Sequence, residues 1–320
     1  MRFLRTICAI LLVGCVTSSW AQGYPSKTIR FIVPWPPGGN ADVLVRILGP
    51  KLAYALGQQV IIDNRGGAAG NIGAELAAKS SADGYTILFA YSGTHSINRS
   101  IYRKMLFQET DFVPIIWLSE VPQVLVVHPS LPVTNVNELI ALAKSKPGEL
   151  TYGSSGSGAI NHLAGELFKL MTGTNVVHVP YKGGGPVAIG LLSGEVGVLF
   201  AGPATVVQHV NAGKLRALAV TTAKRSLTMP HLRTFAESGM PGYEVTSWNG
   251  VLAPTGISKD ITTRLNAELN RIVAASDVRE QMIHSGNEPV GGEPDRFREL
   301  IQSETAKWAK VVKATGMRVD

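Results

Sequence analysis

Short apolar runs alternate with amphipathic segments and Gly-rich turns along most of the chain. Residues 28–33 alternate apolar and polar positions, which predicts a buried strand. The next segment carries on one helical face Val43, Leu44, Ile47, Leu48 and Leu52. Gly57 is expected to end this helix. Further strands are expected over 60–62 and 85–90, with a second Gly-rich turn and a helix between them. This strand–helix order predicts a parallel α/β sheet.

A second unit with the same alternation begins near residue 124. Strands are expected over 124–127, 175–181, 196–202 and 215–221, and helices over 137–145 and from residue 160 to Gly173. The C-terminal third holds two amphipathic helices whose apolar residues are expected to be core. We therefore predict two α/β lobes, the first discontinuous. Residues 22–122 and 223–320 would form lobe 1 and residues 123–222 lobe 2, with the chain crossing near 121–127 and 215–222.

The first 21 residues differ from the rest. Arg2 and Arg5 precede a short apolar run, and small residues flank Trp20, which is typical of a secretory signal peptide cleaved after Ala21. The stretch ending at Cys15 also has the form of a lipobox, so lipidation of Cys15 is the alternative. Either route exports the mature chain to the periplasm.

Composition narrows the function classes. The 320 residues are 45% hydrophobic and 17% charged, as in a globular protein. Both cysteines lie in the leader, so cleavage after Ala21 leaves no disulfide, thiol nucleophile or cysteine metal site in the mature chain. The net charge is +7 with scattered basic residues, which does not favour nucleic acid. Metal-binding and catalytic motifs are missing, so we expect no metal, no cofactor and no enzyme activity. We also expect a monomer.

The stretch "VPWPPGGNAD" joins the first strand to the first helix. It lacks both the P-loop pattern and the dinucleotide glycine spacing, which argues against nucleotide phosphate. Gly38 and Gly39 allow backbone N–H groups to approach a ligand, and Asn40 is expected to cap the helix. A carboxylate would suit the positive helix N-terminus. A plain strand–helix turn is the alternative. Asp42 would repel an anion, so it either belongs to the cap or meets a ligand hydroxyl or water.

A second loop, "YGSSGSG", enters a helix of the other unit. Its serines add hydroxyl donors to the backbone donors. The sequence is not Gly-x-Ser-x-Gly, because Ser157 stands where the closing glycine should be, so a nucleophile elbow is not indicated. Two units that each present a Gly-rich helix N-terminus suit a ligand held between two lobes.

Three polar residues follow the third strand, at the sheet edge where α/β proteins bind ligands: Ser92, Thr94 and His95. His95 would donate to a carboxylate, and a structural hydrogen bond is the alternative. Phe200 and Trp248 are further ligand candidates, each with core packing as the alternative.

Several runs together resemble one family. They are "YPSKTIRFIVPWPPGGNADVLVR", "GQQVIIDNRGGAAGNIGAELAAKSSADGYTIL", "TYGSSGSGAINHLAGELFK", "VPYKGGGPV", "GKLRALAVTT" and "SWNGVLAP", in order over nearly the whole mature chain. This set is similar to the Bug family, the substrate-binding proteins of tripartite tricarboxylate transport systems.

The resemblance implies a periplasmic two-lobed Venus flytrap fold, a small carboxylate ligand held largely by backbone donors, and membrane permease subunits as partners. The contacts that it implies are Pro37, Gly38, Gly39, Asn40, Asp42, Ser92, Thr94 and His95 in the first lobe, and Ser155, Gly156, Ser157 and Gly158 in the second.

One departure from the family concerns the ligand. Many relatives have an acidic residue after the phenylalanine that matches Phe200, whereas this chain has Ala201 and Gly202. An acid there would pair with a ligand ammonium group, so its loss favours plain or aromatic dicarboxylates over amino acids. Two alternatives remain: an exported hydrolase or lyase that uses His95 or His162 with a serine, and a ligand-bound form that signals to a membrane sensor kinase.

Overall fold

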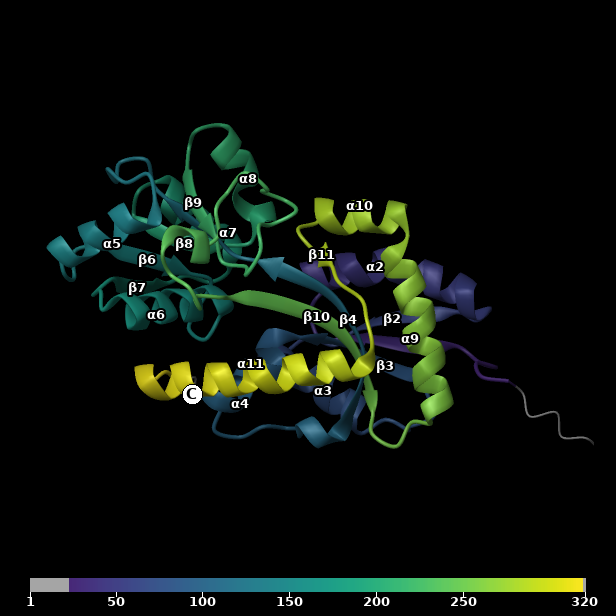
Figure 1. The fold of residues 1–320 in the computed structure, drawn as a ribbon. Helices are drawn as coiled ribbons and strands as arrows, with labels where there is room; N and C mark the ends of the chain where they lie inside the picture. Colours follow the sequence, from purple (N-terminus) through teal and green to yellow (C-terminus); the bar gives the residue numbers. More distant parts are fainter. Residues whose placement is uncertain (1–22, 319–320) are drawn as a thin grey trace, which may run out of the picture.

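The structure is a computed structural model that describes residues 23–318, so the predicted signal peptide lies outside the described range. Two α/β lobes are joined by long strands (Figure 1). Within the described residues, no helix has both the length and the apolar character needed to cross a membrane.

The first lobe is built on a six-stranded sheet of order β11-β4-β10-β3-β1-β2. Its strands are β1 (Ile29–Val33), β2 (Val60–Asn64), β3 (Thr86–Tyr91), β4 (Phe112–Pro122), β10 (Thr246–Pro254) and β11 (Glu288–Pro289). Its helices are α2 (Asn40–Leu56), α3 (Asn71–Ala78), α4 (Asn98–Ile101), α9 (Lys259–Ala274), α10 (Ser276–His284) and α11 (Pro294–Thr315). β1 pairs in parallel with β2 and β3, while β10 is antiparallel to β3 and β4.

The second lobe is built on a five-stranded sheet of order β7-β6-β8-β5-β9. Its strands are β5 (Val124–Val127), β6 (Thr151–Ser154), β7 (Val177–Pro180), β8 (Val198–Ala201) and β9 (Arg216–Val220). Its helices are α5 (Val136–Ser145), α6 (Ile160–Thr172), α7 (Gly184–Leu192) and α8 (Pro203–Asn211). β6 is parallel to β7 and β8, and β5 is antiparallel to β8 and β9.

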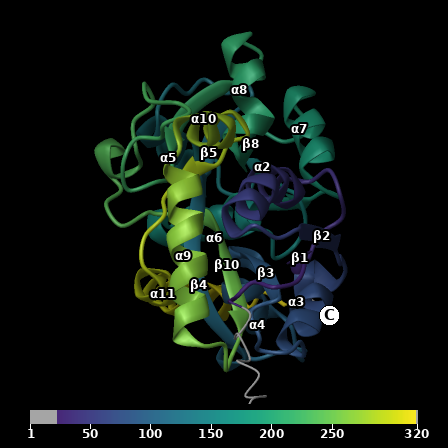
Figure 2. The same cartoon turned by 90° about the vertical axis from the view of Figure 1, so that its right-hand side faces the viewer.

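Helices cover both faces of the first sheet, which explains its nearly continuous apolar strands. α2, α9 and α10 pack together on one face, as Figure 2 shows. On that side the strands contribute Phe31 and Phe89, whereas Ile32 and Leu88 point to the other side, toward α3 and α11.

The first helix ends at Gly57 as predicted, with that glycine in the left-handed conformation at φ 66°. Its buried face differs slightly from the expected one. Val43 is 39% exposed, and Val45 is buried in its place beside Leu44 and Leu48. The helix is rotated so that the more apolar stripe, which continues to Leu56, meets the sheet.

The chain crosses between the sheets at two adjacent places. β4 continues into β5 through Gln123, and β9 leads out through Thr221. The Gln123 N–H donates to Thr221 Oγ1 (3.0 Å), and the Thr221 N–H donates to the Gln123 carbonyl (2.9 Å). Val245, which precedes β10, donates its N–H to the Thr221 carbonyl (3.0 Å) and accepts from the Thr221 hydroxyl. One buried threonine therefore ties both crossings together.

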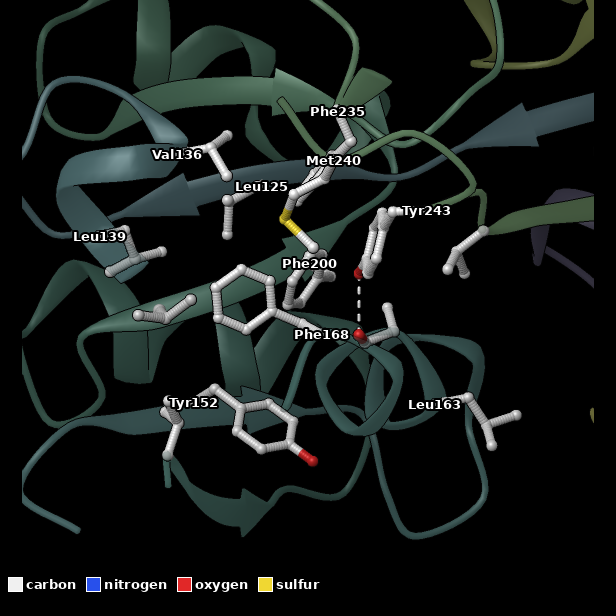
Figure 3. Packing of buried hydrophobic residues seen from close by; sticks show 14 of the residues in the cluster. Leu125, Val136, Leu139, Tyr152, Leu163, Phe168, Phe200, Phe235, Met240 and Tyr243 are labelled. Carbon is white, nitrogen blue, oxygen red and sulfur yellow. Dashed lines mark hydrogen bonds between the residues drawn. The ribbon is translucent and has the colours of Figure 1, made fainter. Parts of the chain in front are cut away.

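The segment that follows β9 packs against the second lobe. Phe235 and Tyr243 lie in the same core cluster as Phe168 and Phe200 of that lobe (Figure 3). The Tyr243 hydroxyl donates to a carbonyl of α6, at 2.8 Å. α11 spans both lobes, because its first turns pack on the first sheet while Trp308 near its end joins this cluster.

We predict that Thr221→Val lowers the free energy of unfolding by about 1–3 kcal/mol, because the buried N–H of Gln123 loses its acceptor while the side-chain volume stays nearly constant. Urea denaturation measures this loss. Thr262→Val is the matched control, since the Thr262 hydroxyl bonds only within its own helix near the surface. Equal stability of the two variants would contradict a special role for Thr221.

Candidate functional site

The first helix begins without a side-chain cap. Gly38 makes the turn at φ 87°, and Gly39 is the N-cap residue in an extended conformation. Asn40 was predicted to cap the helix, and this is wrong: it is the first helical residue, and its side-chain amide donates to the Ser285 carbonyl (3.2 Å). Because no side chain caps this helix, the backbone N–H groups of Asn40 and Ala41 have no acceptor within the described residues.

Asp42 is used inside the loop. Its Oδ2 accepts from the Gly38 N–H (2.9 Å) and from Arg46 Nε (2.9 Å), and its Oδ1 accepts from the Asn64 amide (3.0 Å). The hydrogen bond from Arg46, supported by Gly38 and Asn64, lowers the pKa of this buried carboxyl to about 2. Asp42, predicted as a ligand contact, is thus hydrogen-bonded within the first loop, and Arg46 compensates its charge near the N-terminus of the helix.

The second loop also enters an uncapped helix. The N-cap residue of α6 is Ala159, which has no capping side chain. Gly156 and Gly158 have φ values of 138° and 81°, which L side chains rarely adopt. Within residues 23–318, the N–H and hydroxyl of Ser157 have no partner, and Ser157 is exposed. This loop therefore has free donors at a helix N-terminus.

Two adjoining cavities connect these helix ends, and we call them together the cleft. One, of about 470 Å³, is lined by Trp35, Pro36, Pro37, Gly39, Asn40, Ala41, Tyr91 and Asn249. The other, of about 300 Å³, is lined by Trp35, Ala69, Tyr91, Gly93, Asn98, Ile101, Tyr102, Ser155, Gly156, Ser157, Gly158, Ala159 and Ile160.

The cleft has aromatic walls and no charged lining. Trp35 and Tyr91 line both cavities, and their rings meet edge to face at 5.9 Å. None of the lining side chains carries a charge, and the polar ones are hydroxyls and amides. Any anion bound here must be held by neutral hydrogen-bond donors.

A strained turn forms one wall of the smaller cavity. Ala68 and Ala69 have φ values of 47° and 52°, which alanine rarely adopts. The Ala69 carbonyl accepts from Thr94 Oγ1 (2.9 Å) and from the Asn98 amide (3.1 Å). Thr94 was predicted as a ligand contact, but it is buried and holds this turn instead.

Ser92 and His95 do not line the cleft. Ser92 is fully buried, and its hydroxyl has no partner within the described residues. His95 lines a separate cavity of about 380 Å³, where its ring packs against Phe107 and Phe112. Burial lowers the pKa of His95 to about 3, so the ring is neutral. The chain turns into a π-helical segment after β3, which directs these side chains away from the cleft.

Phe200 and Trp248 also lie away from the cleft. Phe200 packs against Phe168 and Phe235 in the second lobe (Figure 3), and Trp248 packs on Phe297 at 5.1 Å. Both are fully buried. Both residues therefore pack in the core, which was the alternative to a ligand contact.

Several cleft residues were not among the predicted ligand contacts. Trp35 lies within the first loop, next to the predicted contacts there. Tyr91 directly precedes Ser92, and Asn249 directly follows Trp248. In a strand, neighbouring side chains face opposite sides, so each candidate was one residue away from a cleft residue. Asn98 and Tyr102 gave no sequence signal of a site.

One serine–histidine pair bears on the enzyme alternative. Ser154 Oγ lies 2.6 Å from His178 Nε2, a pairing that the sequence did not suggest. Ser154 is fully buried, and its hydroxyl oxygen also accepts from the Gly156 N–H (3.2 Å). A nucleophile in this position has no access to a substrate in the cleft. Among the described residues, no group of His, Cys, Asp and Glu side chains is arranged to hold a metal ion.

Comparison with known proteins gives a consistent family. The family model described as "Tripartite tricarboxylate transporter family receptor" matches residues 44–317. Protein BugT of Bordetella pertussis is 38% identical over 315 residues, covering 97% of this chain and 96% of that protein. A solved R. palustris protein with adipate is 41% identical with a TM-score of 0.79, covering 92% of this chain and 99% of that one. MatC from Rhodopseudomonas palustris with bound malate is 28% identical with a TM-score of 0.74, covering 90% of this chain and 100% of that one.

We predict that Asp42→Asn lowers the free energy of unfolding at pH 7 by about 1–2 kcal/mol. The folded-state pKa is depressed, so the stabilisation from Asp42 is present above the unfolded pKa near 4 and is lost as pH falls toward 2. Urea midpoints of the two proteins should therefore differ at pH 7, approach each other as pH falls below 4, and converge only below pH 2. A gap that persists in acid would show that the carboxylate charge is not responsible.

Proposed function

This chain belongs to the tripartite tricarboxylate transporter family of receptors, and on that premise we propose that it is a periplasmic solute-binding protein. It captures a small carboxylate and delivers it to the membrane permease of a tripartite tricarboxylate transporter. The observation that carries the proposal is the cleft itself, where two uncapped helix N-termini meet cavities without a charged side chain.

Neutral donors are sufficient for this task. A carboxylate that leaves water must have its oxygens hydrogen-bonded, and charge-assisted bonds from N–H groups are among the strongest available. The free N–H groups of Asn40, Ala41 and Ser157 supply them, and the two helix dipoles add a favourable field. We propose as ligand contacts Pro37, Gly38, Gly39, Asn40, Ser155, Gly156, Ser157 and Gly158, together with Trp35, Tyr91 and Asn249.

The cleft supports a plain or aromatic dicarboxylate as ligand. Adipate accompanies one similar structure and malate another, so carboxylates with two acidic ends fit relatives of this fold. In this chain Trp35 and Tyr91 offer apolar surface between the two helix ends. The cleft has no carboxylate for a ligand ammonium group, and Ala201 is buried in β8.

We assign the lobes from core packing. Among the described residues, the first comprises 23–122 and 246–318 and the second comprises 123–245, which places the segment after β9 with the core that it joins. α11 bridges the two. We further propose that the protein acts as an exported monomer. The burial of Ser154 supports a binding role over a catalytic one.

We predict that Gly39→Val abolishes binding without loss of folding. Gly39 lines the larger cavity, its φ of −80° suits valine, and an added Cβ would come no closer than 3.9 Å to its neighbours. A thermal-shift screen over mono-, di- and tricarboxylates identifies a ligand for the wild type. Ligand at a hundred times its dissociation constant stabilises by about 2.7 kcal/mol. The variant should keep its melting temperature but lose the ligand-induced shift.

Gly23→Val is the matched control, because Gly23 also has open space around its Cβ position and lies outside the cleft. It should retain the shift. Normal binding by Gly39→Val would mean that the first loop is only a turn. No shift with any carboxylate for the wild type would overturn the proposed function.

We predict that Ser157→Ala weakens binding about tenfold or more, whereas Lys182→Met changes it less than about fivefold. Hydrogen bonds from a hydroxyl to a desolvated carboxylate are worth more than the field of an exposed lysine. Lys182 lies beside the second loop, because the N–H groups of its neighbours Tyr181 and Gly183 donate to the loop carbonyls, and it does not line the cleft. Calorimetry on both variants tests this. A large loss at Lys182 with none at Ser157 would indicate an ordinary salt bridge.

A further inference from the structure

Two stacked imidazoles lie beside the second loop. The rings of His162, from α6, and His178, from β7, have centroids 3.7 Å apart and planes inclined by 8°. His162 is buried and His178 is half-buried. Neither ring lines the cleft, so neither contacts a ligand there directly.

Each ring is hydrogen-bonded to one end of the loop. The Gly158 N–H donates to His162 Nδ1 (3.0 Å), and Ser154 Oγ lies 2.6 Å from His178 Nε2. Ser154 Oγ in turn accepts from the Gly156 N–H (3.2 Å). The segment between these anchors carries Ser157, which lines the cleft with free donors.

The bond from Gly158 fixes the protonation of His162. Because Nδ1 accepts a hydrogen bond, the neutral ring carries its proton on Nε2, which faces Glu166 Oε1 at 4.0 Å. A doubly protonated ring could not accept from Gly158, since both nitrogens would then be donors.

The surroundings keep both rings neutral near pH 7. The groups that face the pair are Glu166 and Lys169 on α6 and Tyr152 on β6. Lys169 Nζ and the Tyr152 hydroxyl bind Glu166 at 2.8 and 2.6 Å, which compensates its charge. Burial, with a contribution from the adjacent His178, lowers the pKa of His162 to about 4, and burial also lowers the pKa of His178.

We propose that His162 and His178 are positioning residues for ligand capture: as a stacked pair they clamp the two ends of the Ser154–Gly158 loop and thereby hold the donors of Ser157 toward the cleft. The inference rests on the proposed function. The loop needs such a clamp because Gly156 and Gly158 impose little conformational preference of their own. A loop that is already ordered loses less entropy when the ligand binds.

A ligand-free experiment tests the clamp by NMR. Wild-type His162 should show the Nε2–H tautomer, and the amide signals of Ser157 and Gly158 should titrate together with this ring near pH 4. His162→Asn, whose side-chain oxygen replaces Nδ1 as acceptor but does not titrate, should keep the Gly158 signal and lose the step. His162→Leu should speed exchange of the Gly158 amide by about tenfold or more.

Calorimetry with adipate at pH 7.5 tests the effect on capture. His162→Leu should weaken binding about tenfold, and His162→Asn should restore the affinity to within about threefold of the wild type. His231→Leu, at an exposed histidine outside the cleft, is the matched control and should bind normally. Circular dichroism at pH 7.5 confirms that each variant is folded.

The outcomes distinguish the histidine clamp from the proposed function. An Nδ1–H tautomer, or a Gly158 amide that is indifferent to His162→Leu, would overturn the clamp whether or not a ligand binds. Equal affinity of the Leu and Asn variants would overturn its role in capture. If wild type binds neither adipate nor any other carboxylate, the proposed function fails, while the NMR result still decides the clamp.

Discussion

The hydrogen bonds of Thr221 hold the two strand crossings side by side, and the relative placement of the lobes follows from them. Gln123 and Val245 both bond to this one buried residue, so β4–β5 and β9–β10 cannot shift independently. The backbone groups at a crossing have left one sheet and not yet joined the next, and Thr221 supplies the partners that a ladder would otherwise provide. These fixed crossings, together with α11, which packs on both lobes, help to hold the first and second loops on opposite sides of the cleft.

Charged side chains are kept out of the cleft lining. Charged pairs are present near both loops, but none of their side chains lines the cleft. Asp42 pairs with Arg46 inside the first loop, and Glu166 pairs with Lys169 beneath the second. The cleft lining is left with hydroxyls, amides and backbone N–H groups. Neutral donors bind a carboxylate with less desolvation cost than a lysine or arginine would incur, because no cation has to leave water. Such a site also suits the ligand release that the proposed function requires.

The two loops are held by different means. In the first, the side chain of Asp42 folds back on the Gly38 N–H, so a carboxylate with a low pKa fixes the turn. In the second, neutral imidazoles hold Ser154 and Gly158. A strained alanine pair, held by Thr94 and Asn98, forms a third wall. Side chains that mostly lie just outside the cleft lining thus position the backbone donors within it.

The sequence alone determined the α/β class, the two lobes, most strand and helix positions, and the two Gly-rich loops at helix N-termini. These features are local, since periodicity and glycine punctuation arise within a few residues of one another. The tertiary structure decided which side chains reach the cleft. Trp248 was a candidate where its neighbour Asn249 lines the cavity, and Ser92 where Tyr91 does. The sequence could not show which side chains of a strand face the cleft. Both faces of the first sheet are buried, so the pattern of apolar residues does not distinguish one face from the other. The stacking of His162 on His178, from two separate elements, likewise required the fold to bring them together.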